Sequence, residues 1–103
     1  DGHVASLFPC SAALSETRRL VVATTGGDPR LPRVSLTLPV LNQAHTLLWL
    51  VTGTDKAAIV RSVLEAPRPQ ETFPAQRIQP VHGRSEWFLD CAAASLLRTG
   101  AAS

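Results

Sequence analysis

The sequence predicts an α/β fold, in which parallel strands alternate with helices. Residues 46–52 read Thr-Leu-Leu-Trp-Leu-Val-Thr, and such a nearly continuous apolar run is typical of a strand covered on both faces. A helix is expected directly afterwards, over Asp55–Glu65, because its apolar residues recur on one face: Ile59, Val60, Val63 and Leu64. A strand, a helix and a further strand in succession make the unit from which parallel sheets are built.

The elements before this unit are short. Residues 20–24, Leu-Val-Val-Ala-Thr, predict a buried strand that ends at the turn Gly26-Gly27-Asp28-Pro29. A second strand is expected over Val34–Leu38, where apolar and hydroxyl side chains alternate. Pro39 suits the first turn of a short helix that continues through Asn42-Gln43-Ala44.

The helix over Asp55–Glu65 has signals at both ends. Thr54 is expected to cap its first turn, and Pro67 is expected to stop it. Residues 67–83 show little periodicity and predict a long connection, which is punctuated by Pro67, Pro69, Pro74 and Pro80.

The chain is expected to close with one more strand and helix. Trp87-Phe88-Leu89 predicts the strand, and Asp90 is expected to cap an Ala-rich helix that ends near residues 98–100. Trp49 and Trp87 are interpreted as core aromatics on their strands.

Composition excludes several classes of function. The chain has 103 residues, 45% of them hydrophobic and 17% charged, with a net charge of +2. Ten dispersed cations are too few for a nucleic-acid footprint, but a mild excess of them suits a small anionic substrate. We expect no membrane span and no secretory signal, and therefore a cytoplasmic protein. Cys10 and Cys91 predict buried free thiols, with a disulfide as the alternative.

Asp1-Gly2-His3 is the first stretch that suggests chemistry. Histidine titrates near neutral pH, so His3 could take a proton from water without help from a metal. Asp1 could orient the imidazole, and Gly2 allows the backbone to approach a ligand closely. The alternative is a surface histidine in a turn. The absence of Met before Asp1 suggests that an upstream portion is missing.

Four sequence blocks together resemble the 6-phosphogluconolactonase family. They occur in the family's order and span nearly the whole chain. Residues 1–9 resemble D-G-H-x-A-S-L-F-P, residues 33–42 resemble R-[IV]-[TS]-L-T-L-P-x-[IL]-N, residues 50–57 resemble V-T-G-x-x-K-A, and residues 87–93 resemble W-[FY]-x-D-x-x-A. Val4 departs from the pattern, because the family usually has Thr there, and a hydroxyl near the site would be lost.

This resemblance implies a fold and a reaction. Residues 1–103 would be the C-terminal portion of a single NagB/RpiA/CoA-transferase-like (Rossmann-like) parallel-sheet domain whose N-terminal half is absent. The implied reaction is hydrolysis of 6-phospho-D-glucono-1,5-lactone in the oxidative pentose phosphate pathway, with no cofactor or metal. His3 would be the general base, with Asp1 as its acidic neighbour. Arg33 and Lys56 would hold the phosphate.

The position of Lys56 independently favours an anion site. A cation in the first turn of a helix opposes the macrodipole unless an anion lies between its ammonium group and the free N–H groups. Arg33 is suited to phosphate because a guanidinium can donate two parallel hydrogen bonds. The alternative for both residues is a solvated surface side chain.

Two rival functions remain open. A glucosamine-6-phosphate deaminase or isomerase would share the fold and the D-G-H motif, but the following segment, Ala5–Pro9, lacks the Asn and Glu typical of that branch. A catalytically inactive fragment of the fold is the second rival, and the chain could be fused to, or associate with, the absent half. Other candidates carry less weight. Ser6 lacks a G-x-S-x-G elbow, Cys10 is a weaker nucleophile candidate, and His45 and His82 lack partners at metal-ligand spacing.

Overall fold

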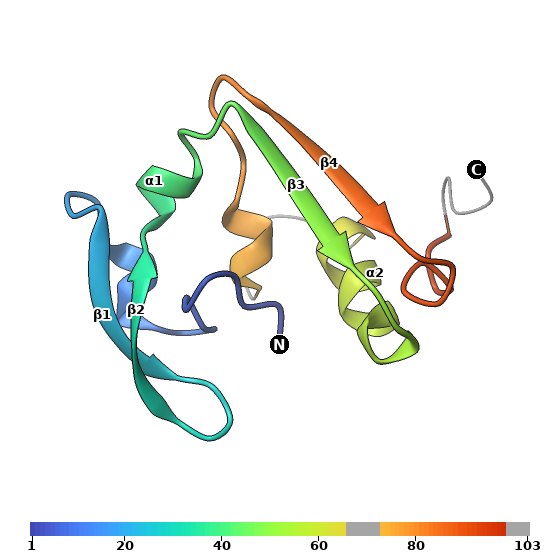
Figure 1. The fold of residues 1–103 in the computed structure, drawn as a ribbon, viewed down its shortest axis with the longest axis horizontal. Helices are drawn as coiled ribbons and strands as arrows, with labels where there is room; N and C mark the ends of the chain where they lie inside the picture. Colours follow the sequence, from blue (N-terminus) through green and yellow to red (C-terminus); the bar gives the residue numbers. More distant parts are fainter. Residues whose placement is uncertain (66–72, 99–103) are drawn as a thin grey trace.

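The computed structural model describes residues 1–65 and 73–98 (Figure 1). These residues contain four strands: β1 (Val21–Gly26), β2 (Leu31–Leu36), β3 (Thr46–Val51) and β4 (Arg84–Leu89). The helices in this described part are α1 (Leu38–Leu41) and α2 (Ala57–Glu65), together with the short 3₁₀ segments η1 (Ala12–Ser15), η2 (Thr54–Lys56) and η3 (Pro74–Arg77). No helix in residues 1–65 and 73–98 is long and apolar enough to cross a membrane.

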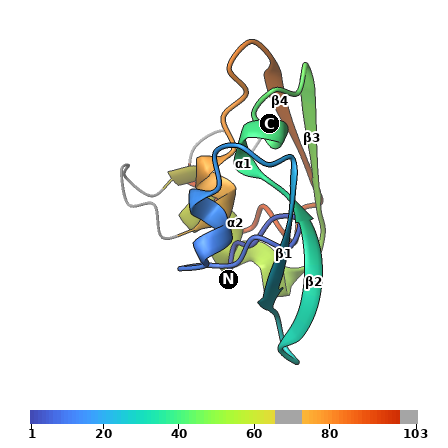
Figure 2. The same cartoon turned by 90° about the vertical axis from the view of Figure 1, so that its left-hand side faces the viewer.

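The strands form two separate pairs. β3 and β4 are parallel, with Trp49 opposite Trp87, and the connection between them contains α2. This pair confirms the expected α/β architecture with a parallel sheet. β1 and β2 are instead an antiparallel hairpin, because only a short turn separates them. In Figure 2 the helical segments η1, α2 and η3 lie on one side of the strands.

The β1–β2 hairpin is more exposed than expected. Its first strand was expected to be buried, but Leu20 and Val21 are 68% and 49% exposed. The strand alternates between exposed and partly buried residues because only one of its faces is covered within residues 1–65 and 73–98. β2 also begins earlier than expected, at Leu31, and gives way to Thr37, whose hydroxyl donates to the carbonyl oxygen of Arg19 at 2.7 Å.

Within residues 1–65 and 73–98, β3 is likewise covered on one face only, which differs from the expectation that both of its faces are buried. Leu48 and Leu50 are 64% and 82% exposed. The other face carries Trp49, whose ring stacks on that of Trp87 with centroids 4.4 Å apart and planes 2° apart. Both tryptophans are therefore on strands as predicted, but they are half-buried rather than enclosed.

The helix after β3 starts differently from the prediction. Gly53, at φ +99°, precedes η2, so Thr54 lies inside this 3₁₀ turn and does not cap the helix with its side chain. The helix α2 then buries Val60 and Val63, while Leu64 is 40% exposed. Pro67 and Pro69 lie outside the described residues, and Pro74 begins η3. The short helix expected after Pro39 is confirmed as α1, although it ends at Leu41.

The expected Ala-rich helix after Asp90 is wrong. Residues 91–96 form successive turns, and residues 99–103 lie outside the described part. Asp90 does accept a hydrogen bond from the backbone N–H of Ala93 at 2.8 Å, as a cap would. The following bonds, from Ser95 to Ala92 and from Leu97 to Ala94, span three residues, so no continuous α-helical ladder forms.

The core is small and lies where the N-terminal segment meets α2 and η3. Its buried apolar members are Leu7, Leu14, Ala57, Val60, Val63, Ala75, Ile78 and Ala93. Cys10 and Cys91 are free, as predicted, but both are exposed rather than buried.

Candidate active site

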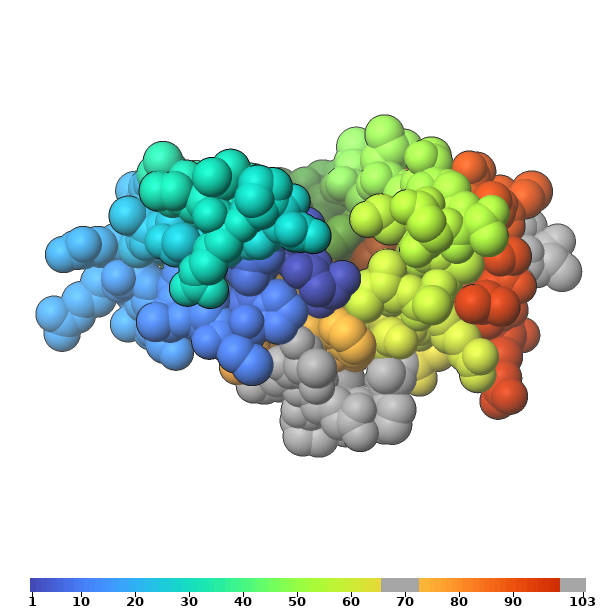
Figure 3. Space-filling view, turned by 90° about the horizontal axis from the view of Figure 1, so that it is seen from below, coloured from blue at the N-terminus to red at the C-terminus, as the bar shows by residue number. Residues whose placement is uncertain are grey.

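The segment that carries Asp1-Gly2-His3 lies between the two strand pairs (Figures 1 and 3). The carbonyl oxygen of Gly2 accepts a hydrogen bond from the N–H of Ala75, at 2.9 Å. The N–H of Ser6 donates to Oγ of Ser35, at 3.1 Å. These bonds attach the segment to η3 on one side of His3 and to β2 on the other.

Gly2 is required by close packing. Its φ of +76° lies in the left-handed region, and a Cβ atom there would lie 2.9 Å from Cβ of Phe73. Any other residue at this position would therefore have a strained backbone, and its side chain would collide with Phe73, the residue before η3. The glycine that the sequence associates with ligand approach thus has a structural role as well.

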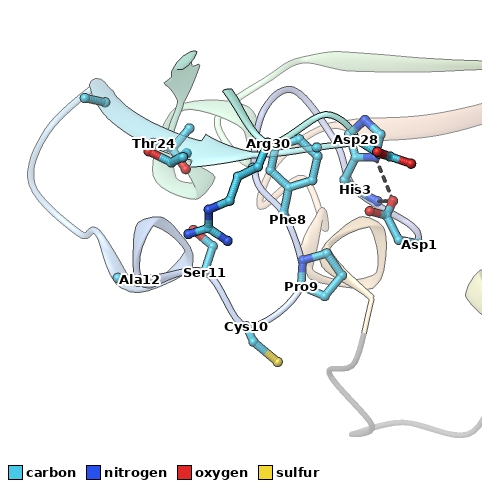
Figure 4. Close-up of a pocket in the computed structure, with 14 residues that line it drawn as sticks. Asp1, His3, Phe8, Pro9, Cys10, Ser11, Ala12, Thr24, Asp28 and Arg30 are labelled. Carbon is cyan, nitrogen blue, oxygen red and sulfur yellow. Dashed lines mark hydrogen bonds and ion pairs between the residues drawn. The ribbon is translucent and has the colours of Figure 1, made fainter. Parts of the chain in front are cut away.

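Asp1 fixes the orientation of His3. Its Oδ1 lies 2.7 Å from Nδ1 of the imidazole and also accepts from the backbone N–H of His3 at 3.1 Å (Figure 4). When a carboxylate accepts Nδ1–H, the lone pair of the neutral ring is on Nε2. The His3 and Asp1 side chains are 45% and 50% exposed, so the pair is open to solvent.

The surroundings of His3 favour its neutral form. Partial burial lowers the pKa of the imidazole below 6.5, and the positive charges of the amino terminus, Lys56 and Arg33 lower it further. A histidine with a lowered pKa is deprotonated at neutral pH and can act as a base.

His3 and Lys56 line the same cavity. This cavity has a volume of about 490 Å³ and lies between the N-terminal segment, β3 and α2. Its wall also includes Trp49, Trp87 and Val60. His3 and Lys56, which the sequence analysis assigned to one site, thus border one cavity, and their roles there stay a prediction.

A second cavity opens on the other side of His3, with a volume of about 880 Å³ (Figure 4). It lies against the hairpin and includes Phe8, Asp28 and Arg30. Sequence reasoning did not identify Arg30. Its signal would have been a cation in the turn that links β1 to β2, but only the folded hairpin shows that this turn reaches the histidine.

Arg33 lines neither cavity. Its Nε donates to the carbonyl oxygen of Gly26 at 2.9 Å, and its Cζ lies 5.7 Å from the centre of the Phe8 ring. Phe8 in turn stacks on His3, with ring centroids 4.7 Å apart. Arg33 therefore reaches the site through its charge and through Phe8.

The remaining candidates contribute little. The Ser6 side chain makes no hydrogen bond to His3, and His45 and His82 are exposed in loops before β3 and β4. Residues 1–65 and 73–98 contain no cluster of three or more His, Cys, Asp or Glu side chains that could hold a metal ion.

Comparison with known proteins gives consistent matches. The family model described as glucosamine-6-phosphate isomerases/6-phosphogluconolactonase matches residues 1–87. The 6-phosphogluconolactonase of Bos taurus is 48% identical over 99 residues, which are 94% of this chain and 38% of that protein. The chain therefore spans less than two fifths of the length of this curated relative.

Solved structures agree. The structure titled "Crystal Structure of devB protein" superimposes with a TM-score of 0.86 at 37% identity, covering 95% of this chain and 41% of that one. The 6-phosphogluconolactonase of Trypanosoma brucei gives a TM-score of 0.81 at 29% identity, covering 95% of this chain and 39% of that one.

Proposed function

This chain belongs to the glucosamine-6-phosphate isomerase/6-phosphogluconolactonase family, and we propose that the whole protein hydrolyses 6-phospho-D-glucono-1,5-lactone to 6-phosphogluconate in the oxidative pentose phosphate pathway. The observation that carries this proposal is the shared cavity of His3 and Lys56, with Nδ1 of His3 held by Asp1. Hydrolysis of a phosphorylated lactone requires a base that activates water and a cation that binds the phosphate.

His3 is the general base of the proposed reaction. Its Nε2 takes a proton from a water molecule as the water oxygen attacks the lactone carbonyl carbon. The carbonyl becomes a tetrahedral oxyanion, and the ring C–O bond then breaks while the imidazolium returns the proton to the leaving oxygen. Asp1 stabilises the transient imidazolium through the 2.7 Å contact with Nδ1.

Lys56 and Arg33 are the proposed phosphate-binding residues. Lys56 is exposed at the end of η2 and lines the cavity with His3, so its ammonium group can approach a phosphate there. Arg33 contributes positive charge from β2, while its Nε is already engaged by Gly26. Gly2 allows the segment to run close to the ligand.

The alternative is the glucosamine-6-phosphate deaminase or isomerase reaction, because the family's description names glucosamine-6-phosphate isomerases beside 6-phosphogluconolactonase. The segment Ala5-Ser6-Leu7-Phe8-Pro9 lacks the Asn and Glu that the deaminase branch carries after its D-G-H motif. The Bos taurus relative is also named 6-phosphogluconolactonase. Both observations favour hydrolysis of the lactone.

We further propose that residues 1–103 are the C-terminal portion of one domain, and that polypeptide corresponding to the rest of the relatives' length completes it. The exposed apolar face of β3 and β4, with Leu48, Leu50 and Phe88, supports this view. Such a partner would be fused to this chain or associated with it. The two free, exposed thiols suit a reducing compartment such as the cytoplasm.

An assay of the complete protein tests the proposed function. The protein is incubated separately with the phosphorylated lactone and with glucosamine 6-phosphate, and acid release and ammonia release are measured. We expect acid release well above spontaneous lactone hydrolysis, and no ammonia. Ammonia release without lactone hydrolysis would establish the deaminase instead. No turnover of either substrate would support an inactive member of the fold.

A further inference from the structure

Phe8 contacts two side chains of the proposed site. Its ring stacks on the imidazole of His3, with centroids 4.7 Å apart and planes 29° apart. The guanidinium carbon of Arg33 lies over the same ring, 5.7 Å from its centre. A cation near the face of an aromatic ring is attracted by the electron-rich π system. The Phe8 ring therefore contacts a polar side chain of the N-terminal segment, His3, and one of β2, Arg33.

Gly26 holds this ring from the end of β1. Gly26 is buried, and a Cβ atom built on it would lie 2.4 Å from Cδ2 of Phe8. The backbone thus approaches the phenyl ring more closely than any other residue type would permit. The carbonyl oxygen of Gly26 also accepts the Nε–H of Arg33 at 2.9 Å. One residue of β1 consequently fixes the positions of both Phe8 and Arg33.

His3 needs a second restraint besides Asp1. The contact between Nδ1 and Oδ1 of Asp1 restrains one atom of the ring, but the plane of the ring can still rotate about that contact. Both partners are about half exposed, so surrounding side chains do not enclose them. A flat contact with a phenyl ring restrains the plane itself.

We propose that Phe8 is a positioning residue for His3: supported by Gly26 and Arg33, its ring holds the imidazole in the plane that directs Nε2 toward the substrate. This inference rests on the proposed function, because it assigns Phe8 a part in the same reaction. It also gives Arg33 a role as a support for Phe8, in addition to its charge.

The test uses the complete protein with Phe8→Leu, Phe8→Tyr and Gly26→Ala, and Phe88→Leu on β4 as the matched control. Phe8→Leu removes the stacked ring, Phe8→Tyr keeps it, and Gly26→Ala displaces it without deleting it. The charged side chains that act on His3, namely Asp1, Lys56 and Arg33, are unchanged in all four. Circular dichroism identifies the variants that fold, and only those are compared.

We expect Phe8→Leu and Gly26→Ala to lower kcat by about tenfold, since small misplacements of a reacting group are costly, and to change KM less than about twofold. The midpoint of the ascending limb of the kcat–pH profile should move upward, because the imidazole becomes better solvated. Phe8→Tyr should retain kcat within about twofold and keep the wild-type midpoint. Phe88→Leu should leave the midpoint unchanged.

Nuclear magnetic resonance of labelled histidine gives a readout independent of turnover. The Hε1 signal of His3 should shift downfield when the phenyl ring is removed or displaced, and its titration midpoint should rise. Folded Phe8→Leu and Gly26→Ala variants with unchanged kcat and an unchanged His3 titration would overturn the inference. If the wild-type protein does not hydrolyse the lactone but the His3 signal still responds to Phe8→Leu, the proposed function is wrong. The stacking of Phe8 on His3 is then supported independently of that function.

Discussion

Asp90 holds Gly53 with both of its carboxylate oxygens. The backbone nitrogen of Gly53 lies 3.2 Å from Oδ1 and 3.2 Å from Oδ2. Because Gly53 follows β3 and Asp90 follows β4, this contact joins the carboxyl ends of the two parallel strands. Oδ1 also accepts from the N–H of Ala93. A single side chain therefore organises the turn that leads to Lys56.

We expect Asp90→Ala to lower the free energy of unfolding by about 1–3 kcal/mol, because two backbone N–H groups lose a charged acceptor. Asp90→Asn keeps one acceptor oxygen and should lose less. Urea unfolding of this chain measures the change. The control is Glu86→Gln, whose ion pair with Arg84 at 3.6 Å is exposed and should contribute at most about 0.5 kcal/mol. Equal effects at both positions would show that the Asp90 contacts do not stabilise the turn.

The order of the elements was predictable from the sequence because it depends on local signals. The apolar run that forms β3, the proline of α1 and the apolar stripe of α2 are each patterns contained within a short stretch of the sequence. The faces of the strands were not predictable in this way. Leu50 reads as a core residue, but burial depends on which other segments lie against it, and that is a property of the whole fold.

Local signals also failed after Asp90. The Ala-rich segment there has high helix propensity and a capping bond from Ala93 to Asp90, yet residues 91–96 form turns. Within the site, Asp1 and His3 were recognisable because they are two residues apart. The contacts of Phe8 with Gly26 and Arg33 were not, because they depend on how the hairpin folds back over the N-terminal segment.

His3→Ala tests the proposed base. In the complete protein we expect kcat to fall by about 10²–10⁴-fold, because a general base contributes in this range, while KM changes little. The wild-type kcat should fall as the pH falls through the pKa of His3, which lies below 6.5, since the protonated ring cannot accept a proton. Initial rates measured from acidic to neutral pH give both results. An unchanged kcat in His3→Ala would exclude this base.

Lys56→Ala separates substrate binding from proton transfer. The loss of the ammonium group should raise KM for the phosphorylated lactone by about tenfold or more, because a charged hydrogen bond to the phosphate is lost. Removal of a positive charge that lowers the pKa of His3 should also move the ascending limb of the kcat–pH profile to higher pH. Lys56→Arg keeps the charge and should leave that limb in place. Ser62→Ala on α2 is the control for the effect that an alanine substitution has on the stability of this helical segment. A KM unchanged in Lys56→Ala would place the phosphate elsewhere, for example at Arg30 in the second cavity.

Leu50→Asp tests whether another part of the domain covers the open face of the parallel sheet. In this 103-residue chain Leu50 is 82% exposed, so the substitution should change the free energy of unfolding by less than about 0.5 kcal/mol. In the complete protein the same substitution should cost about 3 kcal/mol or more, because it removes a buried leucine and places an unpaired charge in its position. Urea unfolding of both proteins gives the comparison.

The control is Val81→Asp, at a residue 61% exposed in the loop before β4, which should have a small effect on the free energy of unfolding of both proteins. Equally small effects of Leu50→Asp in the two proteins would mean that this face remains open to water.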